Sequence, residues 1–292
     1  MVDAHDDQAA GLRRLLAFSH ARTIAVVAGT RGAGATSCVV NLAASISRQG
    51  RRVLVVDENY DNNISQSLGI RPRFDLRHAI EGECATGEAL TWGPGGIAVL
   101  AAAGAARALQ RLDPQSEERA IRCFGELDGA ADIVLIDARN DSDDASPFTA
   151  AAQEVIVVVS PGSSSITGGY TAIKRMCRTH ARRRFRLLVN RAPDDVTARL
   201  VQANMAQVTK KHLDVALEYM GAIPIDPAVL VSVRRFSAAV DAAPTAAASR
   251  RYCEYADAML RWSAPQDDVS RLDTFMQRAI YGSRLQAAGA GA

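Results

Sequence analysis

Short, nearly continuous runs of Val, Ile, Leu and Ala recur along the chain and are separated by longer, more polar stretches. These runs do not alternate with polar residues, which is typical of strands that are buried on both faces of a sheet. The pattern predicts strands at residues 23–28, 52–56, 97–101, 132–136, 154–160, 185–190 and 217–223.

Stretches with the character of helices lie between these runs, at residues 37–48, 116–127, 165–180, 195–212 and 248–262. Strands that alternate with helices predict an α/β fold with three α/β/α layers and a mostly parallel, twisted sheet. Ligands of such folds bind at the carboxyl ends of the strands.

The same pattern divides the chain into a main domain at residues 21–262 and two appendages. Residues 1–20 precede the first strand and are expected to form a short helix. Residues 263–270 have the composition of a linker, and residues 271–286 are expected to form a last helix.

A glycine-rich segment follows the first predicted strand and opens the first predicted helix. Gly29, Gly34 and Thr36 stand in the register of G-x-x-x-x-G-K-[ST], but Ala35 takes the place of the lysine. Glycines allow backbone N–H groups to turn toward one anion at a helix N-terminus. The segment predicts a phosphate-binding loop made of Gly29, Thr30, Arg31, Gly32, Ala33, Gly34, Ala35, Thr36 and Ser37.

Polar residues end three other predicted strands. Asp57 and Asn59 follow the second strand, and Asp137 ends the strand at 132–136. Carboxylates at strand ends beside a phosphate loop commonly serve Mg²⁺ or the attacking water, so a magnesium and switch site is expected at Thr36, Asp57, Asn59 and Asp137. Asp57 could instead cap a helix. At another strand tip the Asn190 amide could pair with the edge of adenine or simply form a turn.

Composition narrows the classes of function. The chain has 292 residues and a formal charge of +2, which is too small to argue for nucleic acid. Its five cysteines form no C-x-x-C pair, which disfavours a zinc site and fits a reducing cytoplasm. No apolar run approaches the length of about 20 residues that spans a membrane. A basic stretch at residues 174–186 is expected to be a solvated helix end.

Together these motifs resemble the MinD/ParA class of P-loop ATPases, and most closely its FlhG/FleN branch, which controls flagellar number and placement. The resemblance runs from about residue 23 to residue 262, and segments 161–170 and 219–226 also match the branch. It implies a P-loop NTPase fold that binds ATP or ADP with Mg²⁺, with Asn190, Arg191 and Pro224 near the nucleotide.

The chain departs from the family pattern at positions that bind phosphate or take part in hydrolysis in that family. Thr30 replaces the signature lysine that reaches the partner's phosphates, Ala35 replaces the loop lysine, and Asn59 replaces the second switch aspartate. Loss of one charged phosphate contact costs roughly 1.5–3 kcal/mol of binding, whereas a charge on the transferring phosphoryl is worth about 10³–10⁵ in rate. Weak ATP binding and poor hydrolysis are therefore expected, with no catalytic residue assigned. Arg31 and Arg139 are expected to face solvent.

The N-terminus carries the pattern Asp-Gln-Ala-x-x-Leu-Arg, whose specified residues are Asp7, Gln8, Ala9, Leu12 and Arg13. In the family that the chain resembles, this motif docks on the GTPase FlhF and stimulates GTP hydrolysis, with the Gln reaching the partner's site. The resemblance therefore implies FlhF as a partner. The alternative is a solvated, frayed chain end.

The predicted last helix has one apolar stripe that includes Leu272, Phe275, Met276 and Ile280. The stripe could lie on the inner face of the cell membrane, where two copies in a homodimer would bind better than one. It could equally pack on its own domain.

The favoured function is that of an FlhG-like flagellar regulator. One alternative is an active MinD-like ATPase switch that cycles between an ATP-bound dimer and a monomer. Another is a ParA-like, DNA-associated positioning protein, although the basic stretch lacks the interleaved aromatics of a sequence-reading surface.

Overall fold

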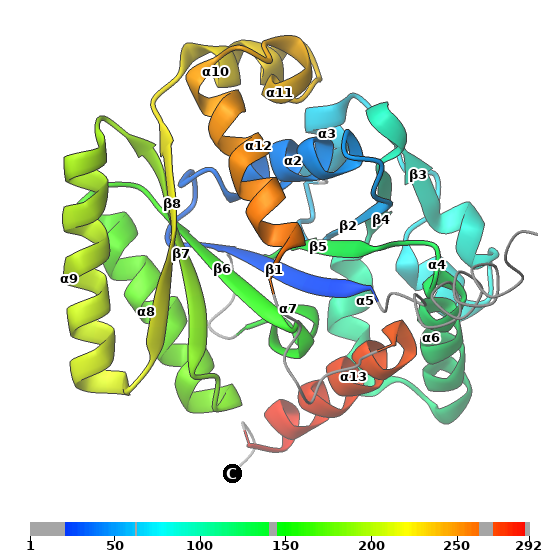
Figure 1. Cartoon of the computed structure of the whole chain (residues 1–292). Helices are drawn as coiled ribbons and strands as arrows, with labels where there is room; N and C mark the ends of the chain where they lie inside the picture. Colours follow the sequence, from blue (N-terminus) through cyan, green and yellow to red (C-terminus); the bar gives the residue numbers. More distant parts are fainter. Residues whose placement is uncertain (1–20, 62, 140–144, 263–270, 290–292) are drawn as a thin grey trace, which may run out of the picture.

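The computed structural model describes residues 21–61, 63–139, 145–262 and 271–289. In these residues the strands form one eight-stranded sheet with the order β3-β4-β2-β5-β1-β6-β7-β8, and all neighbours are parallel except β3 and β4 (Figure 1). The strands are β1 (Arg22–Ala28), β2 (Val53–Asp57), β3 (Leu90–Trp92), β4 (Ala98–Ala101), β5 (Ile133–Asp137), β6 (Glu154–Val159), β7 (Arg184–Ala192) and β8 (Ala216–Pro224).

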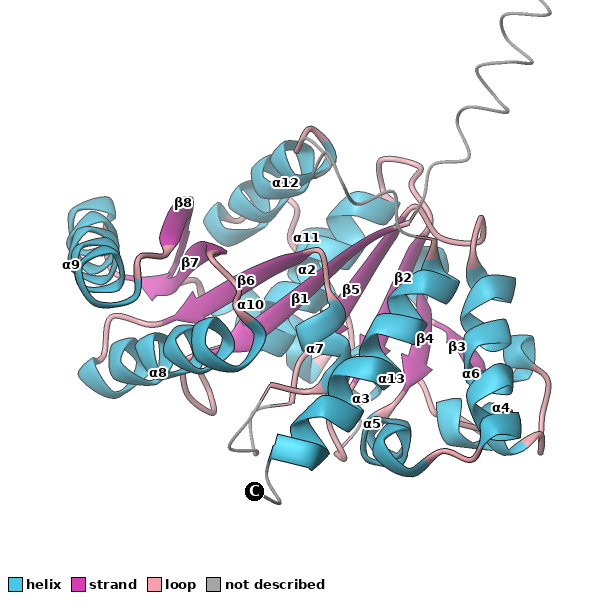
Figure 2. Cartoon of the chain, turned by 90° about the horizontal axis from the view of Figure 1, so that it is seen from below, coloured by secondary structure: helices cyan, strands magenta, loops and turns pink. Residues whose placement is uncertain are grey.

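Helices cover both faces of the sheet, which confirms the predicted three-layer α/β/α fold. Figure 2 shows α6, α7, α8 and α13 in front of the sheet and α2 behind it. The helices are α2 (Ala35–Ser47), α3 (Asn63–Leu68), α4 (Leu76–Glu81), α5 (Ala103–Ala108), α6 (Pro114–Leu127), α7 (Pro147–Ala151), α8 (Ser163–His180), α9 (Asp195–Leu213), α10 (Pro227–Arg234), α11 (Ala239–Ala242), α12 (Ala247–Leu260) and α13 (Leu272–Gly289).

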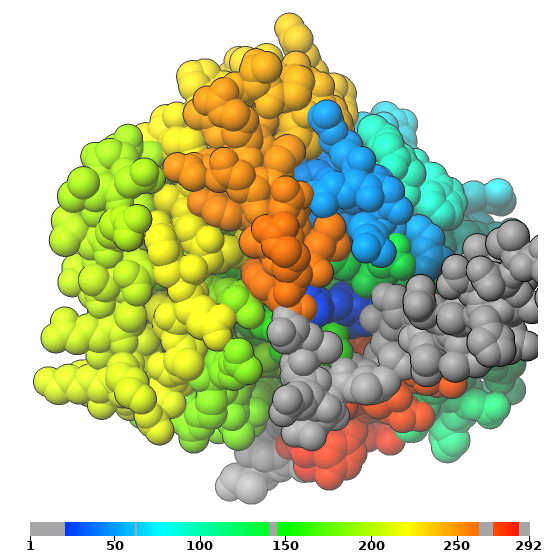
Figure 3. Space-filling view, in the orientation of Figure 1, coloured from blue at the N-terminus to red at the C-terminus, as the bar shows by residue number. Residues whose placement is uncertain are grey.

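The alternation of side chains along each strand produces two cores, one on each face of the sheet. On β1, Ile24 and Val26 pack with residues of α2 and α12, whereas Ala25 and Val27 pack with residues of α6, α8 and α13. In the space-filling view, α12 (orange) covers the first face with α2 (blue) beside it (Figure 3). Because both faces are covered, the strands need the continuous apolar runs from which they were predicted.

All seven predicted strands are present, with ends that differ by one or two residues. The structure adds β3, an antiparallel edge strand of three residues, and the short helices α3, α4, α5, α7, α10 and α11. Apart from α10, which has eight residues, these elements contain less than two full periods of a hydrophobic pattern, so the pattern does not predict them.

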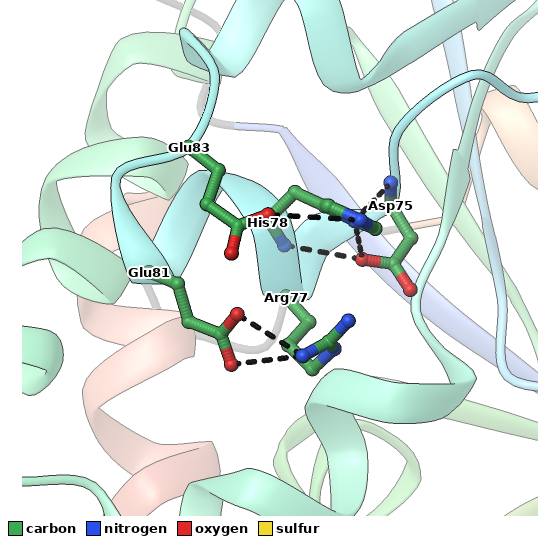
Figure 4. A network of polar contacts seen from close by, with 5 residues as sticks. All are labelled: Asp75, Arg77, His78, Glu81 and Glu83. Carbon is green, nitrogen blue, oxygen red and sulfur yellow. Dashed lines mark hydrogen bonds and ion pairs between the residues drawn. The ribbon is translucent and has the colours of Figure 1, made fainter.

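Helix α4 shows how a short helix is stabilised locally (Figure 4). Asp75 Oδ1 accepts a hydrogen bond from the His78 N–H at 3.1 Å, and the Asp75 N–H donates to His78 Nδ1 at 3.2 Å. Along the same helix, the Arg77 guanidinium lies 3.0 Å from the Glu81 carboxylate, four residues later. Such caps compensate for unpaired N–H groups in the first turn.

The C-terminal helix α13 packs on its own domain. The Phe275 ring lies 5.8 Å from the ring of Phe124 on α6 and 6.2 Å from that of Phe148 on α7, centroid to centroid. Leu272, Phe275, Met276 and Ile280 are each at most 1% exposed. The interpretation of this stripe as a membrane-binding surface is therefore wrong for this arrangement, because its apolar side chains complete the core over α6 and α7. Of the described helices, none combines the length and apolarity needed to cross a membrane.

The basic stretch at 174–186 is less solvated than expected. Arg182 donates to the backbone carbonyls of Ala150 and Gln153, and Arg183 donates to that of Leu213. The guanidinium of Arg186 stacks 3.7 Å above the Trp262 ring and pairs with carboxylates on β6 and β8. These arginines tie strand ends to the neighbouring helix and loop backbone.

The packing of α13 predicts a large stability effect. Phe275→Ala should lower the free energy of unfolding by about 3–5 kcal/mol, because it opens a cavity in the aromatic cluster. Tyr281→Ala is the matched control on the same helix, since Tyr281 is 66% exposed, and should change stability by about 0.5 kcal/mol or less. Urea unfolding measures both. Equal, small effects would contradict the docking of α13.

Candidate functional site

The predicted nucleotide-binding residues gather at the carboxyl edge of the sheet. The chain continues from β1 toward β2 on one side of the sheet and from the neighbouring β6 toward β7 on the other. The crevice beyond the ends of β1 and β6 is therefore the switch point where α/β folds bind ligands. A cavity of about 820 Å³ opens there, lined in part by Gly34, Ala35, Thr36, Asn59 and Asp137. Its volume suits a nucleotide-sized ligand.

The glycine-rich loop presents unpaired backbone donors to this cavity. Gly34 is the N-cap of α2 with φ 92°, a left-handed conformation that favours glycine, and no side chain caps the helix. The first intrahelical bond runs from the Cys38 N–H to the Gly34 carbonyl at 3.0 Å. The N–H groups of the first turn are therefore available to an anion, as predicted from the motif.

Asn190 has a different position from the one predicted. It is buried behind the loop, and its Nδ2 donates to the Ala33 carbonyl at 2.8 Å. A Cβ on Gly34 would lie 2.2 Å from the same Nδ2. The amide therefore holds the loop backbone and does not line the cavity, so its predicted pairing with adenine does not fit this geometry.

Helix α8 supports the loop from the other side. A Cβ on Gly168 would lie 1.8 Å from the Gly29 carbonyl oxygen, and a Cβ on Gly29 would lie 2.3 Å from the Ser165 carbonyl oxygen. The start of the loop thus rests directly on the backbone of α8. This contact gives a physical role to the matching segment at 161–170, which the sequence alone did not reveal.

The four polar residues of the predicted magnesium site do come together. Asp57 and Asp137 are paired neighbours at the ends of β2 and β5. Asn59 Nδ2 lies between them, 3.2 Å from Asp57 Oδ1 and 2.9 Å from Asp137 Oδ2. Thr36 Oγ1 donates to Asp137 Oδ2 at 2.8 Å, which links the loop to this pair.

Burial dominates the electrostatics of these carboxylates. Burial and the neighbouring Asp57 carboxylate hold the pKa of Asp137 well above its usual range, although the Thr36 hydroxyl opposes the shift. Burial also raises the pKa of Asp57, against the hydrogen bonds from the Asn59 and Ile64 N–H groups. Both shifts favour neutral side chains unless a positive group approaches.

These side chains, as arranged, do not fit a magnesium ion. Mg²⁺ is held by oxygen ligands, commonly one or two carboxylates together with substrate phosphates. Here the donor set includes an amide N–H between the two carboxylates, and its hydrogens point at the oxygens that a hydrated cation would use. A cation placed between these two carboxylates would have to displace the Asn59 side chain.

Glu58 is a buried acid beside the site, and the sequence patterns did not indicate a role for it. Its carboxylate accepts hydrogen bonds from the Ser146 hydroxyl, the Arg139 N–H at 3.3 Å and the Thr149 hydroxyl at 3.4 Å. Burial raises the pKa of Glu58 to about 7 against these hydrogen bonds. The sequence signal that could have indicated this acid is its position directly after a predicted buried strand. Its contacts fix the N-terminus of α7, whose N-cap is Ser146.

Three arginines contribute to the lining of the cavity: Arg31, Arg139 and Arg191. The Arg31 side chain is 94% exposed and lies 3.5 Å from the Asp61 carboxylate. Arg139 was expected to face solvent, and this expectation is wrong, because its Nε and Nη1 atoms are buried beside the cavity. Arg191 adopts φ 56° at the end of β7. Among the described lining residues there is no lysine.

Some predicted residues lie elsewhere. Thr30 and Ala33 belong to the loop but do not line the cavity, and Pro224 lines a separate cavity of about 440 Å³ with Arg250 and Glu254. The motif residues Asp7, Gln8, Ala9, Leu12 and Arg13 lie outside the described residues.

The comparisons with known proteins agree with this fold. Residues 24–237 match the family model described as the CobQ/CobB/MinD/ParA nucleotide binding domain. Because this match covers most of the chain, the protein belongs to that family of nucleotide-binding domains.

Within it, the chain is 34% identical over 261 residues to the antiactivator FleN of Pseudomonas aeruginosa, which covers 89% of this chain and 93% of FleN. The chain therefore belongs to the FleN branch of the MinD/ParA family, as the resemblance implied. The flagellum site-determining protein YlxH of Helicobacter pylori is 24% identical and covers 68% of each chain. In fold, the chain is similar to one in the Aquifex aeolicus MinC:MinD cell division complex, with a TM-score of 0.65, 21% identity and 86% and 100% of the two chains covered.

Two glycines of the loop provide a matched test of its geometry. Gly32→Ala and Gly34→Ala both place an alanine at positive φ, at 85° and 92°, which costs about 1 kcal/mol of stability. Only the Gly34 variant also drives a Cβ into the Asn190 amide, whereas Gly32 has open space. We expect Gly34→Ala to cost at least about 1 kcal/mol more in urea unfolding. Equal losses would refute the Asn190 support of the loop.

Proposed function

We propose that this protein is an FlhG-type regulator of flagellar number and placement that acts in the cytoplasm by binding and stimulating the GTPase FlhF through its N-terminal motif. The observation that carries the proposal is similarity to FleN along 93% of FleN's length, in a chain that has kept the motif at residues 7–13. The similarity to YlxH, which is named as a flagellum site-determining protein, also supports a flagellar role. The nucleotide-binding domain then serves as a scaffold for this interaction.

The proposed scaffold binds ATP or ADP weakly. The first-turn N–H groups of α2 and the helix dipole attract phosphate oxygens, and this attraction does not depend on the missing lysine. Without a lysine at position 35, one charge-assisted contact is lost, which weakens binding roughly ten- to a hundredfold.

Hydrolysis should suffer more than binding. Phosphoryl transfer depends on positive charge at the transferring group and on a residue that orients the attacking water. Ala35 and Thr30 supply no charge, and the Asn59 amide is already occupied as a donor to Asp57 and Asp137. This arrangement favours a partner-binding role over an ATP-driven cycle.

The experiment that tests the FlhF role measures GTP turnover by FlhF of the same bacterium with and without the full chain. The wild-type chain should accelerate turnover, and Gln8→Ala should remove most of the acceleration. Gln277→Ala, which changes an exposed glutamine on α13, is the matched control and should act like wild type. Full acceleration by the Gln8 variant would contradict the proposal.

A second prediction concerns the loop. Ala35→Lys should tighten ATP binding roughly ten- to a hundredfold, because it restores the charged contact with the phosphates. Ala35→Met is the control, since it adds a side chain of similar length without charge. Isothermal titration measures both variants. If the methionine variant gains as much affinity as the lysine variant, the loop charge is not what limits binding.

One observation favours a second function, an ATP-bound dimer of the MinD type. Val233 and Phe236 line the cavity, and Phe236 is 59% exposed. Leu230, three residues before Val233 on α10, is 62% exposed. Large exposed apolar side chains beside a ligand site commonly mark an interface. A doubling of the mass measured by light scattering on addition of ATP, abolished by Leu230→Ser, would support this function.

A further inference from the structure

The side chain of Asn59 occupies the position between the two carboxylates at the nucleotide edge. Its Nδ2 has three oxygen acceptors within 3.3 Å, namely Asp57 Oδ1, Asp137 Oδ2 and the Asp137 carbonyl. The backbone N–H of Asn59 adds a fourth contact, to Asp57 Oδ1 at 3.0 Å.

The atoms around the Asn59 amide determine which of its two ends, the nitrogen or the oxygen, lies between Asp57 and Asp137. An oxygen atom here would face three other oxygens, which is repulsive, so the amide must turn its nitrogen inward. The remaining Asp57 oxygen, Oδ2, accepts from the Ile64 N–H at 3.0 Å, and Asp137 Oδ2 also accepts from Thr36. Three of the four carboxylate oxygens are therefore already satisfied by protein donors.

At the point between Asp57 and Asp137, a cation and this amide are mutually exclusive. The N–H hydrogens carry partial positive charge, and they point into the oxygens that a hydrated Mg²⁺ would need. The family pattern instead has an aspartate at position 59, which would put a third carboxylate beside Asp57 and Asp137. Three neighbouring carboxylates repel one another, and either a bound cation or protonation relieves this repulsion. An asparagine at position 59 removes one of the three charges.

We propose that the cavity binds the phosphates of a nucleotide without Mg²⁺, and that the Asn59 amide takes the place of the cation between Asp57 and Asp137. The inference rests on the proposed nucleotide-binding role of this cavity, and it adds the form of the ligand, which is the metal-free nucleotide.

The charge of the cavity is consistent with such a ligand. A nucleotide without its cation carries more negative charge, which has to be balanced by the protein. Arg31, Arg139 and Arg191 all line the cavity, and guanidinium groups bind phosphate oxygens in pairs. The first-turn N–H groups of α2 add donors that need no metal to act.

The direct test compares the binding of ATP and ADP to the full chain in excess Mg²⁺ and in excess EDTA by equilibrium dialysis. The dissociation constants should agree within about threefold. Binding that is tenfold or more tighter with Mg²⁺ would overturn the inference and leave the proposed nucleotide binding intact. No binding under either condition would overturn both.

A variant provides a readout with the metal alone. Asn59→Asp should create a cation site, so its melting temperature should rise on addition of Mg²⁺ without nucleotide. Asn63→Asp adds the same charge at the lining of the same cavity, but in the described structure the Asn63 side chain bonds neither Asp57 nor Asp137. The wild type and the Asn63 variant should show no such rise.

Two outcomes of the melting experiment would contradict the inference. The first is a wild-type melting temperature that rises with Mg²⁺ as much as that of Asn59→Asp. The second is a folded Asn59→Asp protein that does not respond to Mg²⁺. If that variant does not fold, the dialysis of the wild-type chain still decides the question.

Discussion

The hydrogen bonds from the Asn59 amide to the carboxylates of Asp57 and Asp137 determine what the nucleotide edge can do. Both carboxylates are buried at the ends of adjacent strands, and a buried acid without a partner is costly. A neutral amide supplies that partner from within the chain. This contact supports our proposals that the edge needs no cation and that the amide does not orient a water molecule.

In the rest of the site, contacts between distant segments hold the glycine-rich loop in place. Asn190 supports the loop at Ala33, and the close contact of Gly29 with Gly168 fixes it on α8. These contacts shape a cradle for phosphate. The side chains that would act on the phosphate, at positions 30 and 35, are Thr and Ala. A supported loop without these lysines fits the binding role that we propose.

Sequence patterns anticipated the features that repeat over many residues or follow a fixed spacing, namely the strands, the long helices and the glycine loop. They did not separate a core-facing stripe from a membrane-facing one at Phe275, because core and membrane are both apolar surroundings. The positions of Asn190, Glu58 and Arg139 depend on contacts between distant segments. No local pattern encodes those contacts, so only the structure reveals them.

We propose that the domain holds a nucleotide but lacks the groups that hydrolyse it. Release of radiolabelled phosphate from ATP by the purified full chain, at saturating nucleotide, tests this most directly. Release should be no faster than in a sample without protein, while dialysis of the same preparation should detect bound ATP. Sustained turnover that scales with protein concentration would contradict it.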